Sequence, residues 1–274
     1  MAKRPKFVKP EHRDIISAHV LGSKQISPSF VRVTIGGDDL RGFTPMGFDH
    51  WFRMFLPDQG VSGFRLPTSA GNLWYAQFKL IPKDVRPVLR NYTVREFRPT
   101  GGVFGDGPEL DIDFASHGDL GPASAWANSC APGDPLGLLD EGLIYNPTPG
   151  GRWHLLVGDE SALPAIVGIL RSVDPALQVR SYIEIPHADD RQDVPVSDNI
   201  EVQWLVRDDA SAKPGELALA AVTAADLPDG PSYTFVAGES DLATGVRRHL
   251  VNDRHVPKGD IAFTGYWRHG HAAY

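Results

Sequence analysis

The segment Arg90-Asn91-Tyr92-Thr93-Val94-Arg95, followed downstream by His117-Gly118-Asp119-Leu120-Gly121-Pro122-Ala123-Ser124, is the most informative part of this sequence. In a β-strand, Arg90 and Tyr92 would share one face and Thr93 would point to the other. A guanidinium can pair with a phosphate, and a phenol ring can stack on a flat heterocycle. A surface strand with an exposed arginine is the alternative, and it is favoured for the first segment in isolation because such short combinations are common.

The second segment is a glycine-containing turn that leads into an expected helix. Gly118 and Gly121 lack side chains where backbone N–H groups would have to approach an anion. Pro122 suits the first turn of a helix, and a helix N-terminus favours a phosphate through its free amides and its dipole. An ordinary strand-to-helix turn is the alternative. Together the two segments indicate a ligand with a flat ring and a pyrophosphate, which describes a flavin dinucleotide.

The length and composition of the chain restrict its class. A length of 274 residues favours two domains. The formal net charge of −7 excludes a whole-molecule basic field for nucleic acid. The single cysteine, Cys130, excludes an internal disulfide and a cysteine-based metal site. Residues 1–10 lack the apolar stretch of a signal peptide and no run is long enough to span a membrane, so we expect a cytoplasmic protein without membrane insertion.

The N-terminal half has the pattern of short strands separated by Gly/Pro turns. Residues 29–35, 51–55 and 109–115 are the expected strands, and the last alternates acidic and apolar residues as a half-buried strand does. This pattern predicts an antiparallel barrel or sandwich. We expect residues 60–87 to form an elaborated loop or an extra hairpin.

The pattern changes after residues 146–151, whose sequence Asn-Pro-Thr-Pro-Gly-Gly breaks regular structure. Beyond it, expected strands at 153–157, 178–185, 201–206, 233–237 and 261–266 alternate with expected helices at 162–171, 216–224 and 241–250. Such alternation predicts a parallel sheet with covering helices. The predicted domains are therefore an antiparallel β domain over residues 1–148 and an α/β domain over residues 149–274.

Two turns of the C-terminal half lie where a parallel sheet binds ligands, beyond the carboxyl ends of its strands. Gly158-Asp159-Glu160-Ser161 follows one expected strand, and Gly238-Glu239 ends another. The carboxylates would repel a pyrophosphate, so the first turn is not a G-x-G-x-x-G fingerprint. If these turns are functional, we expect the first to face a nicotinamide ribose. The alternative is that the acids are ordinary helix-start residues.

These motifs, in their order, resemble the siderophore-interacting proteins, which are flavin-dependent ferric-siderophore reductases of the ferredoxin-reductase superfamily. The resemblance covers nearly the whole chain. It rests on residues 90–95, His117-Gly118-x-x-Gly121-Pro122-Ala123-Ser124-x-Trp126-Ala127, residues 158–165, residues 237–239 and Tyr266-Trp267-Arg268-x-Gly270. Each motif is weakly specific, and the ordered set is highly specific.

The resemblance implies an N-terminal FAD-binding barrel and a C-terminal NAD(P)H-binding α/β domain. Arg90 would contact the FAD phosphate, Tyr92 would stack on the isoalloxazine, and Thr93 would lie near its reactive edge. The whole set of expected FAD-binding residues is Arg90, Tyr92, Thr93, Val94, Arg95, Asp113, His117, Gly118, Pro122, Ala123, Ser124, Glu160, Ser161 and Trp267. The expected NAD(P)H-binding residues are Gly158, Asp159, Arg207, Gly238 and Glu239.

Three of these assignments have open alternatives. Arg53 is the candidate for receiving the ferric chelate, and an ordinary exposed strand residue is its alternative. Arg207 could meet a 2′-phosphate, as could Arg247 and Arg248, or all three could be surface arginines of a helix or strand. Trp267 could line the flavin or belong to a solvated C-terminal tail. His269 and His271 in that tail have no third ligand nearby, so we expect no metal site.

The function that the resemblance implies is transfer of electrons from NADH or NADPH through FAD to the Fe³⁺ of a ferric siderophore. A reduced ferredoxin is a further candidate donor. No catalytic acid–base residue is expected, because the cofactor carries the chemistry. A general flavin reductase or ferredoxin-linked electron-transfer flavoprotein, and a non-catalytic siderophore carrier, are the alternative functions.

Overall fold

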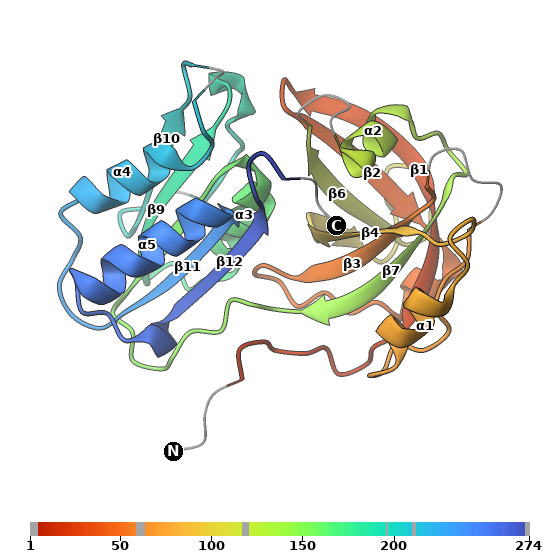
Figure 1. Cartoon of the computed structure of the whole chain (residues 1–274), viewed down its shortest axis with the longest axis horizontal. Helices are drawn as coiled ribbons and strands as arrows, with labels where there is room; N and C mark the ends of the chain where they lie inside the picture. Colours follow the sequence, from red (N-terminus) through yellow and green to blue (C-terminus); the bar gives the residue numbers. More distant parts are fainter. Residues whose placement is uncertain (1–4, 59–63, 117–120, 196, 210–211, 272–274) are drawn as a thin grey trace. The chain divides into compact units, whose positions relative to one another are not determined.

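The chain folds into two compact units in a computed structural model that describes residues 5–58, 64–116, 121–195, 197–209 and 212–271 (Figure 1). The barrel unit comprises residues 8–46 and 50–143, and the α/β unit comprises the described parts of residues 1–7, 47–49 and 144–274. The division predicted between residues 148 and 149 stays a prediction. No helix in the described residues has the length and apolar character that crossing a membrane requires.

The barrel unit is a seven-stranded sheet in which every pairing is antiparallel. Its strand order is β4-β3-β7-β1-β2-β6-β5. The strands are β1 (Ile15–Ser27), β2 (Phe30–Gly36), β3 (Trp51–Leu56), β4 (Val88–Thr93), β5 (Glu96–Arg98), β6 (Glu109–Ala115) and β7 (Pro135–Gly142), and helix α2 (Pro122–Ser129) follows β6.

Residues Val94 and Arg95 connect β4 and β5, the two edge strands of the sheet. The amide of Val94 donates to the carbonyl of His50, just before β3, at 2.7 Å. The next amide, that of Arg95, donates to the carbonyl of Asp111 on β6 at 2.9 Å. The sheet therefore curls until its two edges meet at this link, and the predicted antiparallel barrel is confirmed.

The segment between β3 and β4 differs from its prediction as a loop or hairpin. Its described part contains a helix, α1 (Trp74–Leu80). Trp74 and Phe78 lie one helical turn apart and pack against Phe55 of β3 and Leu139 of β7. This i, i+4 pair was hard to recognise in the sequence because the helix has only seven residues and ends just before Pro82.

The α/β unit contains a five-stranded parallel sheet of order β10-β9-β8-β11-β12, as predicted. Helices α4 and α5 pack on one face, where their apolar residues join the core of β8 and β11, and α3 lies on the other face (Figure 1). The strands are β8 (Trp153–Gly158), β9 (Gln178–Ile185), β10 (Ile200–Val206), β11 (Ser232–Glu239) and β12 (Ile261–Trp267), and the helices are α3 (Leu163–Ser172), α4 (Glu216–Ala224) and α5 (Ser240–Asn252).

The order of these strands creates one switch point. From β8 the chain adds β9 and β10 on one side, and it then returns to add β11 and β12 on the other. The connections leave β8 and β11 in opposite directions, and in open α/β sheets a ligand-binding crevice forms at the carboxyl ends of such strands. Strand β8 ends at Gly158 and strand β11 ends at Glu239, so both predicted turns lie at these two carboxyl ends.

Candidate functional site

Strand β4 presents the expected cation and ring on one face. Arg90 and Tyr92 pair across the strands with Met54 and Phe52 of β3, so all four side chains lie on the same side of the sheet. Tyr92 is half-buried, and its ring centroid lies 4.2 Å from that of Phe114 on β6. Burial raises the pKa of Tyr92 above its ordinary value, so the phenol stays neutral. Arg90 is half-buried and its Nη1 donates to the carbonyl of Leu89 at 2.7 Å.

A chain of aromatic rings connects β4 with helix α2. The Phe114 ring that contacts Tyr92 also lies 5.8 Å, centroid to centroid, from the ring of Trp126 on α2. Trp126 is buried. The contacts Tyr92–Phe114 and Phe114–Trp126 therefore bring the β4 motif and the helix after β6 into one cluster. Sequence reasoning identified both ends of this chain but missed Phe114, whose only sequence signal is its position on the apolar side of an alternating strand.

Helix α2 begins as the sequence predicts. Gly121 is its extended N-cap residue and makes no side-chain cap, and Pro122 occupies the first turn. The amides of Ala123 and Ser124 belong to the first turn, whose N–H groups have no acceptor within a helix. Within the described part of the chain, a Cβ added at Gly121 would meet no atom within 4 Å, so there is space beside the N-cap residue. His117 and Gly118, the other residues expected here, lie outside the described residues.

These features fit a flavin dinucleotide. A half-buried phenol ring offers a face for a flat heterocycle, and a neighbouring guanidinium offers a positive charge for a phosphate. The N-terminus of α2, which has no side-chain cap from Gly121, offers amides and a helix dipole for a pyrophosphate. Thr93 is buried and pairs with Trp51 across β3, on the opposite face from Tyr92.

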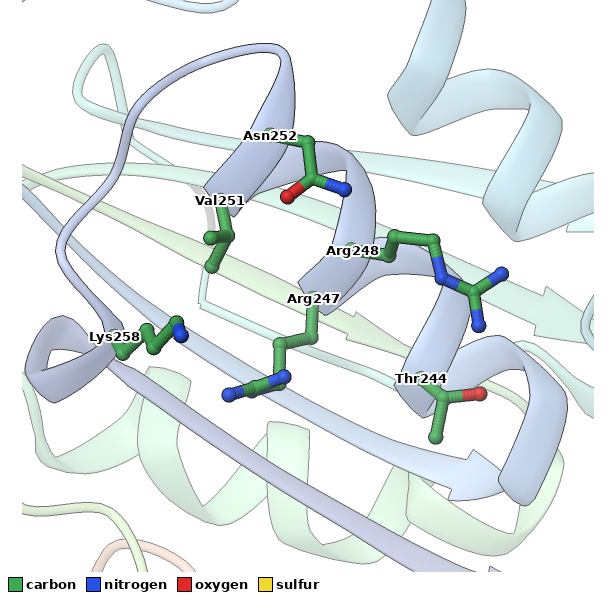
Figure 2. Close-up of a pocket in the computed structure, with 6 residues that line it drawn as sticks. All are labelled: Thr244, Arg247, Arg248, Val251, Asn252 and Lys258. Carbon is green, nitrogen blue, oxygen red and sulfur yellow. The ribbon is translucent and has the colours of Figure 1, made fainter.

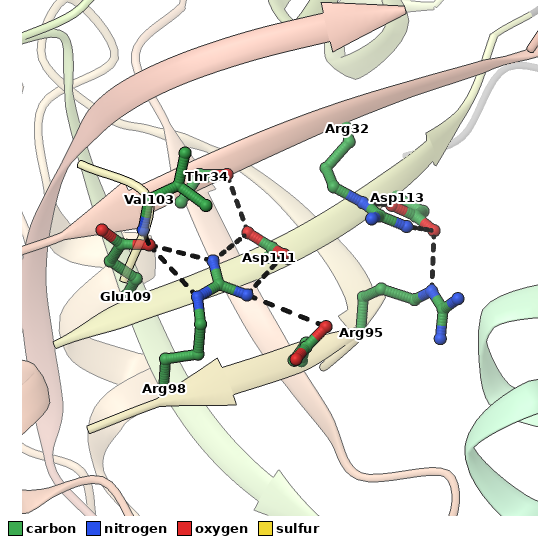
Figure 3. Close-up of polar contacts among 9 residues, drawn as sticks. Arg32, Thr34, Arg95, Arg98, Val103, Glu109, Asp111 and Asp113 are labelled. Carbon is green, nitrogen blue, oxygen red and sulfur yellow. Dashed lines mark hydrogen bonds and ion pairs between the residues drawn. The ribbon is translucent and has the colours of Figure 1, made fainter. Parts of the chain in front are cut away.

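Asp113 binds two arginines, Arg95 and Arg32 (Figure 3). The Asp113 carboxylate is fully buried and binds Arg32 through Oδ1 at 2.7 Å and through Oδ2 at 2.9 Å. Arg95 Nε donates to Oδ2 of the same carboxylate at 3.1 Å. Asp113 thus forms ion pairs with both arginines. The expected contacts of Arg95 and Asp113 with a cofactor stay predictions.

The acidic side of β6 is more deeply buried than the predicted half-buried strand. Glu109, Asp111 and Asp113 are nearly inaccessible to solvent, and arginines from neighbouring strands cover them. Arg98 of β5 donates to Asp111 at 2.8 Å and to Glu109 at 3.0 Å (Figure 3). Burial raises the pKa of Asp111, but hydrogen bonds from Arg98 and Thr34 outweigh it and hold that pKa below its ordinary value. This face of the sheet, beside the β4–β5 link, is therefore a layer of buried carboxylates paired with arginines.

Arg53 lies on the opposite face of β3 from the residues that pair with Arg90 and Tyr92. Its Nε donates to Oε1 of buried Glu141 at 2.6 Å. Its guanidinium carbon lies 4.9 Å from the ring centroid of Trp74 on α1 and 5.4 Å from that of Trp51. The structure therefore does not bring Arg53 together with the β4 motif, and its role as a substrate contact stays a prediction.

At the carboxyl ends of the parallel strands, one buried carboxylate connects three elements. Asp159, directly after β8, accepts hydrogen bonds from the Ser161 amide at 2.9 Å and from the Glu239 amide of β11 at 2.6 Å. Trp267 Nε1, at the end of β12, donates to the same carboxylate at 3.0 Å. Gly238 is required here, because a Cβ would lie 2.6 Å from the Asp159 carboxyl and the residue has a φ of 126°.

Glu239 caps helix α5 and holds the chain beyond β12. Its Oε2 accepts from the amides of Asp241 and Leu242, and its Oε1 accepts from the amide of His269 at 3.1 Å. Trp267 is the last residue of β12 and is half-buried. The alternative in which Trp267 belongs to a solvated tail is therefore wrong. The interpretation of the two acids as helix-start residues describes part of their role, and sequence reasoning missed their contacts to β12.

Glu160 and Arg207 form a buried ion-pair cluster with Glu184. The two Nη atoms of Arg207 bind the carboxylate of Glu160 at 2.7 and 2.9 Å, and Nη1 also binds Glu184 at 2.8 Å. Arg207 is 9% exposed. Burial alone would lower the pKa of Arg207, but its hydrogen bonds to the two glutamates raise it above the ordinary value. The alternative of a surface arginine is wrong, and the contact of Arg207 with NAD(P)H stays a prediction.

The Asp159 carboxyl predicts a specific pH dependence of stability. Burial, and then the charge of Glu160, raise the pKa of Asp159 to about 7, although its hydrogen bonds act in the opposite direction. In an unfolded chain the pKa of an aspartate is about 4. The folded chain therefore holds this proton more tightly, and the resulting stability is complete below pH ~4 and is lost as the pH rises to ~7.

We expect Asp159→Asn to remove this part of the pH dependence. The variant cannot ionise at this position, so its melting temperature should fall less between pH 5 and pH 8 than that of the wild type. Thermal unfolding followed by circular dichroism at each pH measures both slopes. The amide nitrogen also replaces an oxygen that accepts two hydrogen bonds, which shifts all values together, so only the difference in slope matters. Parallel curves would contradict the assignment.

Comparison with known proteins places the chain in a family. The model of the siderophore-interacting FAD-binding domain matches residues 19–143, and the model of the siderophore-interacting protein matches residues 151–270. A ferric vibriobactin reductase of Vibrio cholerae is 32% identical over 252 residues, which are 90% of this chain and 87% of that protein.

Two further relatives extend the match over nearly the full length. An uncharacterized protein of Mycobacterium tuberculosis is 33% identical over 269 residues, which are 94% of this chain and 92% of that protein. The crystal structure of a siderophore utilization protein from T. fusca superposes with a TM-score of 0.76 at 28% identity and covers 95% of each chain. An antiparallel barrel, a parallel α/β unit and these matches together show that the chain belongs to the siderophore-interacting protein family.

Proposed function

We propose that this chain is an FAD-dependent ferric-siderophore reductase that takes electrons from NADH or NADPH and releases iron as Fe²⁺. The observation that carries the proposal is the row of ring contacts Tyr92–Phe114–Trp126, which joins the β4 motif to helix α2. The matched FAD-binding domain and the relatives named for ferric vibriobactin and ferric acinetobactin reduction support the same function.

The residues of the barrel unit would bind and orient the cofactor. Packing against Phe114 limits the orientations of the Tyr92 ring, so Tyr92 would lose little side-chain entropy when a flavin stacks on it. Arg90 would place a positive charge near a phosphate, and the first amides of α2 would bind the pyrophosphate. Bound FAD supplies the redox chemistry, namely acceptance of hydride from reduced nicotinamide and delivery of electrons to Fe³⁺.

The carboxyl ends of β8 and β11 are the proposed site for the nicotinamide nucleotide. They flank the switch point of the sheet, where such ligands bind in open α/β folds. Asp159 and Glu239 accept hydrogen bonds from their own chain, so their role would be to fix the shape of this crevice. A cytoplasmic location, where reduced nicotinamide is supplied, is part of the proposal.

Siderophores hold iron through oxygen ligands, which bind Fe²⁺ less strongly than Fe³⁺ because its charge is lower. One-electron reduction of the chelated ion therefore weakens the complex and allows the iron to leave. Transfer of an electron requires proximity and not a proton donor. A ferric chelate would accordingly need only a place to approach the flavin, and the chain would need no acid–base pair for the reaction.

Anaerobic spectroscopy of the purified protein tests the function. The protein should bind FAD and be yellow, and NADH, NADPH or reduced ferredoxin should bleach it in separate experiments. Reoxidation by ferric siderophores, compared with free flavin and with protein electron acceptors, separates the proposed reductase from a general flavin reductase. A colourless protein that ignores added FAD would contradict the proposal and favour a non-catalytic carrier.

A further inference from the structure

A cavity of about 350 Å³ lies beside helix α5 in the α/β unit (Figure 2). Half of its lining residues carry a positive charge and none is acidic, although the whole chain has a formal net charge of −7. The cavity is therefore a local positive region on an acidic protein. Its lining residues are Thr244, Arg247, Arg248, Val251, Asn252 and Lys258.

Two of the cations converge across the cavity. Arg247 comes from α5 and Lys258 from the short 3₁₀-helix η4 (Lys258–Asp260), and their side chains point toward each other, whereas Arg248 extends from another side of the helix (Figure 2). No ion pair among the described residues involves Arg247 or Lys258. Two like charges that face each other repel, and an anion between them would remove this repulsion.

The guanidinium of Arg247 packs against the ring of Phe263. Its carbon lies 4.6 Å from the ring centroid of Phe263 on β12, which is cation–π geometry. Its Nε is buried and has no hydrogen-bond partner among the described residues. An arginine whose orientation is fixed loses less side-chain entropy when it binds, and its planar fork matches the oxygens of a phosphate.

We propose that Arg247 and Lys258 form a binding site for a phosphate-class anion, either a free phosphate or diphosphate or the terminal phosphate of a larger molecule. The tetrahedral oxygens of such an anion can accept from the guanidinium and from the ammonium at the same time. This site is separate from the functions assigned to the carboxyl ends of the strands.

The separation follows from the sheet. Lys258 precedes β12, whose first residue, Ile261, pairs with Thr234 near the start of β11. The crevice residue Trp267 is six residues further along β12, which corresponds to about 20 Å of extended strand. An anion at Arg247 and Lys258 would therefore lie toward the amino ends of the strands, away from Asp159 and Glu239. The inference does not depend on the proposed reductase function.

Titration calorimetry with inorganic phosphate and with pyrophosphate tests the site, on the purified protein at constant ionic strength. The wild type should show saturable binding, and the double variant Arg247→Gln/Lys258→Gln should bind at least about tenfold more weakly, because it loses two charge-assisted hydrogen bonds. The control Lys24→Gln/Arg171→Gln removes two exposed cations elsewhere and should keep the wild-type affinity. ADP as a third titrant distinguishes a free anion from the terminal phosphate of a larger molecule.

Equal affinities in the double variant and in the control would overturn the proposal, and so would binding that never saturates. Loss of the Arg247–Phe263 contact could prevent the double variant from folding. In that case Lys258→Gln alone decides, because Lys258 is exposed and makes no core contact. This single variant should weaken phosphate binding by about threefold or more, which corresponds to part of one charge-assisted contact. An unchanged affinity would exclude the site.

Discussion

Replacing Arg207 with leucine is expected to lower the free energy of unfolding of this protein by about 3–5 kcal/mol. Arg207 binds Glu160 and Glu184, and both carboxylates are fully buried. The substitution removes the cation that both buried carboxylates contact and leaves them unpaired. Each must then stay charged in a poorly solvated place or take up a proton, and both outcomes cost free energy. Urea unfolding monitored by circular dichroism measures the loss.

Two further variants separate this effect from a general effect of removing an arginine. Arg180→Gln breaks a partly exposed ion pair with Glu201, and such pairs contribute below about 1 kcal/mol. In the triple variant Arg207→Leu/Glu160→Gln/Glu184→Gln, no buried charge is left unpaired, so part of the lost stability should return. The amides of Gly215 and Ala218 donate to different oxygens of Glu184, so the single amide oxygen introduced by Glu184→Gln can keep one of these two hydrogen bonds and the recovery should be partial. An Arg207→Leu variant as stable as the wild type would contradict the structural role of the cluster.

Replacing Tyr92 with alanine is expected to weaken FAD binding by about tenfold or more, since stacking of a flat heterocycle on an aromatic side chain contributes roughly 1–3 kcal/mol. Tyr92 is the half-buried ring of the β4 motif, and its position is set by contact with Phe114. Titration of the apoprotein with FAD, followed by flavin fluorescence, gives the dissociation constants. The expected result is a higher dissociation constant with the barrel still folded.

The matched control is Tyr92→Phe. It keeps the ring and its contact with Phe114, and it removes only the hydroxyl, so FAD affinity should stay within about threefold of the wild type. Comparing the melting temperatures of the two apoproteins shows how much of any loss comes from a cavity beside Phe114. If Tyr92→Ala binds FAD as tightly as Tyr92→Phe, the flavin does not stack on this residue.

Some elements were readable from local pattern. The five strands of the α/β unit are short apolar runs between Gly, Pro and polar turns, and each was predicted within a few residues of its observed bounds. In the barrel unit, β2, β3 and β6 were predicted and the β4 motif was treated as a strand, whereas β1, β5 and β7 were not predicted. Buried Ile16, Ala18 and Val20 alternate along β1, but small and polar residues between them weaken the signal.

Part of the candidate site could be predicted from the sequence, because those residues depend on local patterns. The residues Arg90 and Tyr92 and the helix start at Pro122 depend on strand alternation and helix capping, which operate over a few neighbouring residues. The environments of Arg53, Asp113 and Arg207 depend on partners far away in the sequence. Arg207 contacts Glu160 and Glu184, 47 and 23 residues away, and no local pattern indicates such a pairing.

The sequence by itself determined the class of fold, the family and the two motifs that would hold a flavin dinucleotide, because each follows from local periodicity or from ordered short motifs. Only the tertiary structure decided which charges are available for binding. It pairs Arg53 with Glu141, Asp113 with two arginines and Arg207 with two glutamates, and it places Arg247 opposite Lys258. The physical reason is that the cost of burying a charge, and the partner that offsets it, depend on contacts between distant segments that form only when the strands assemble into sheets.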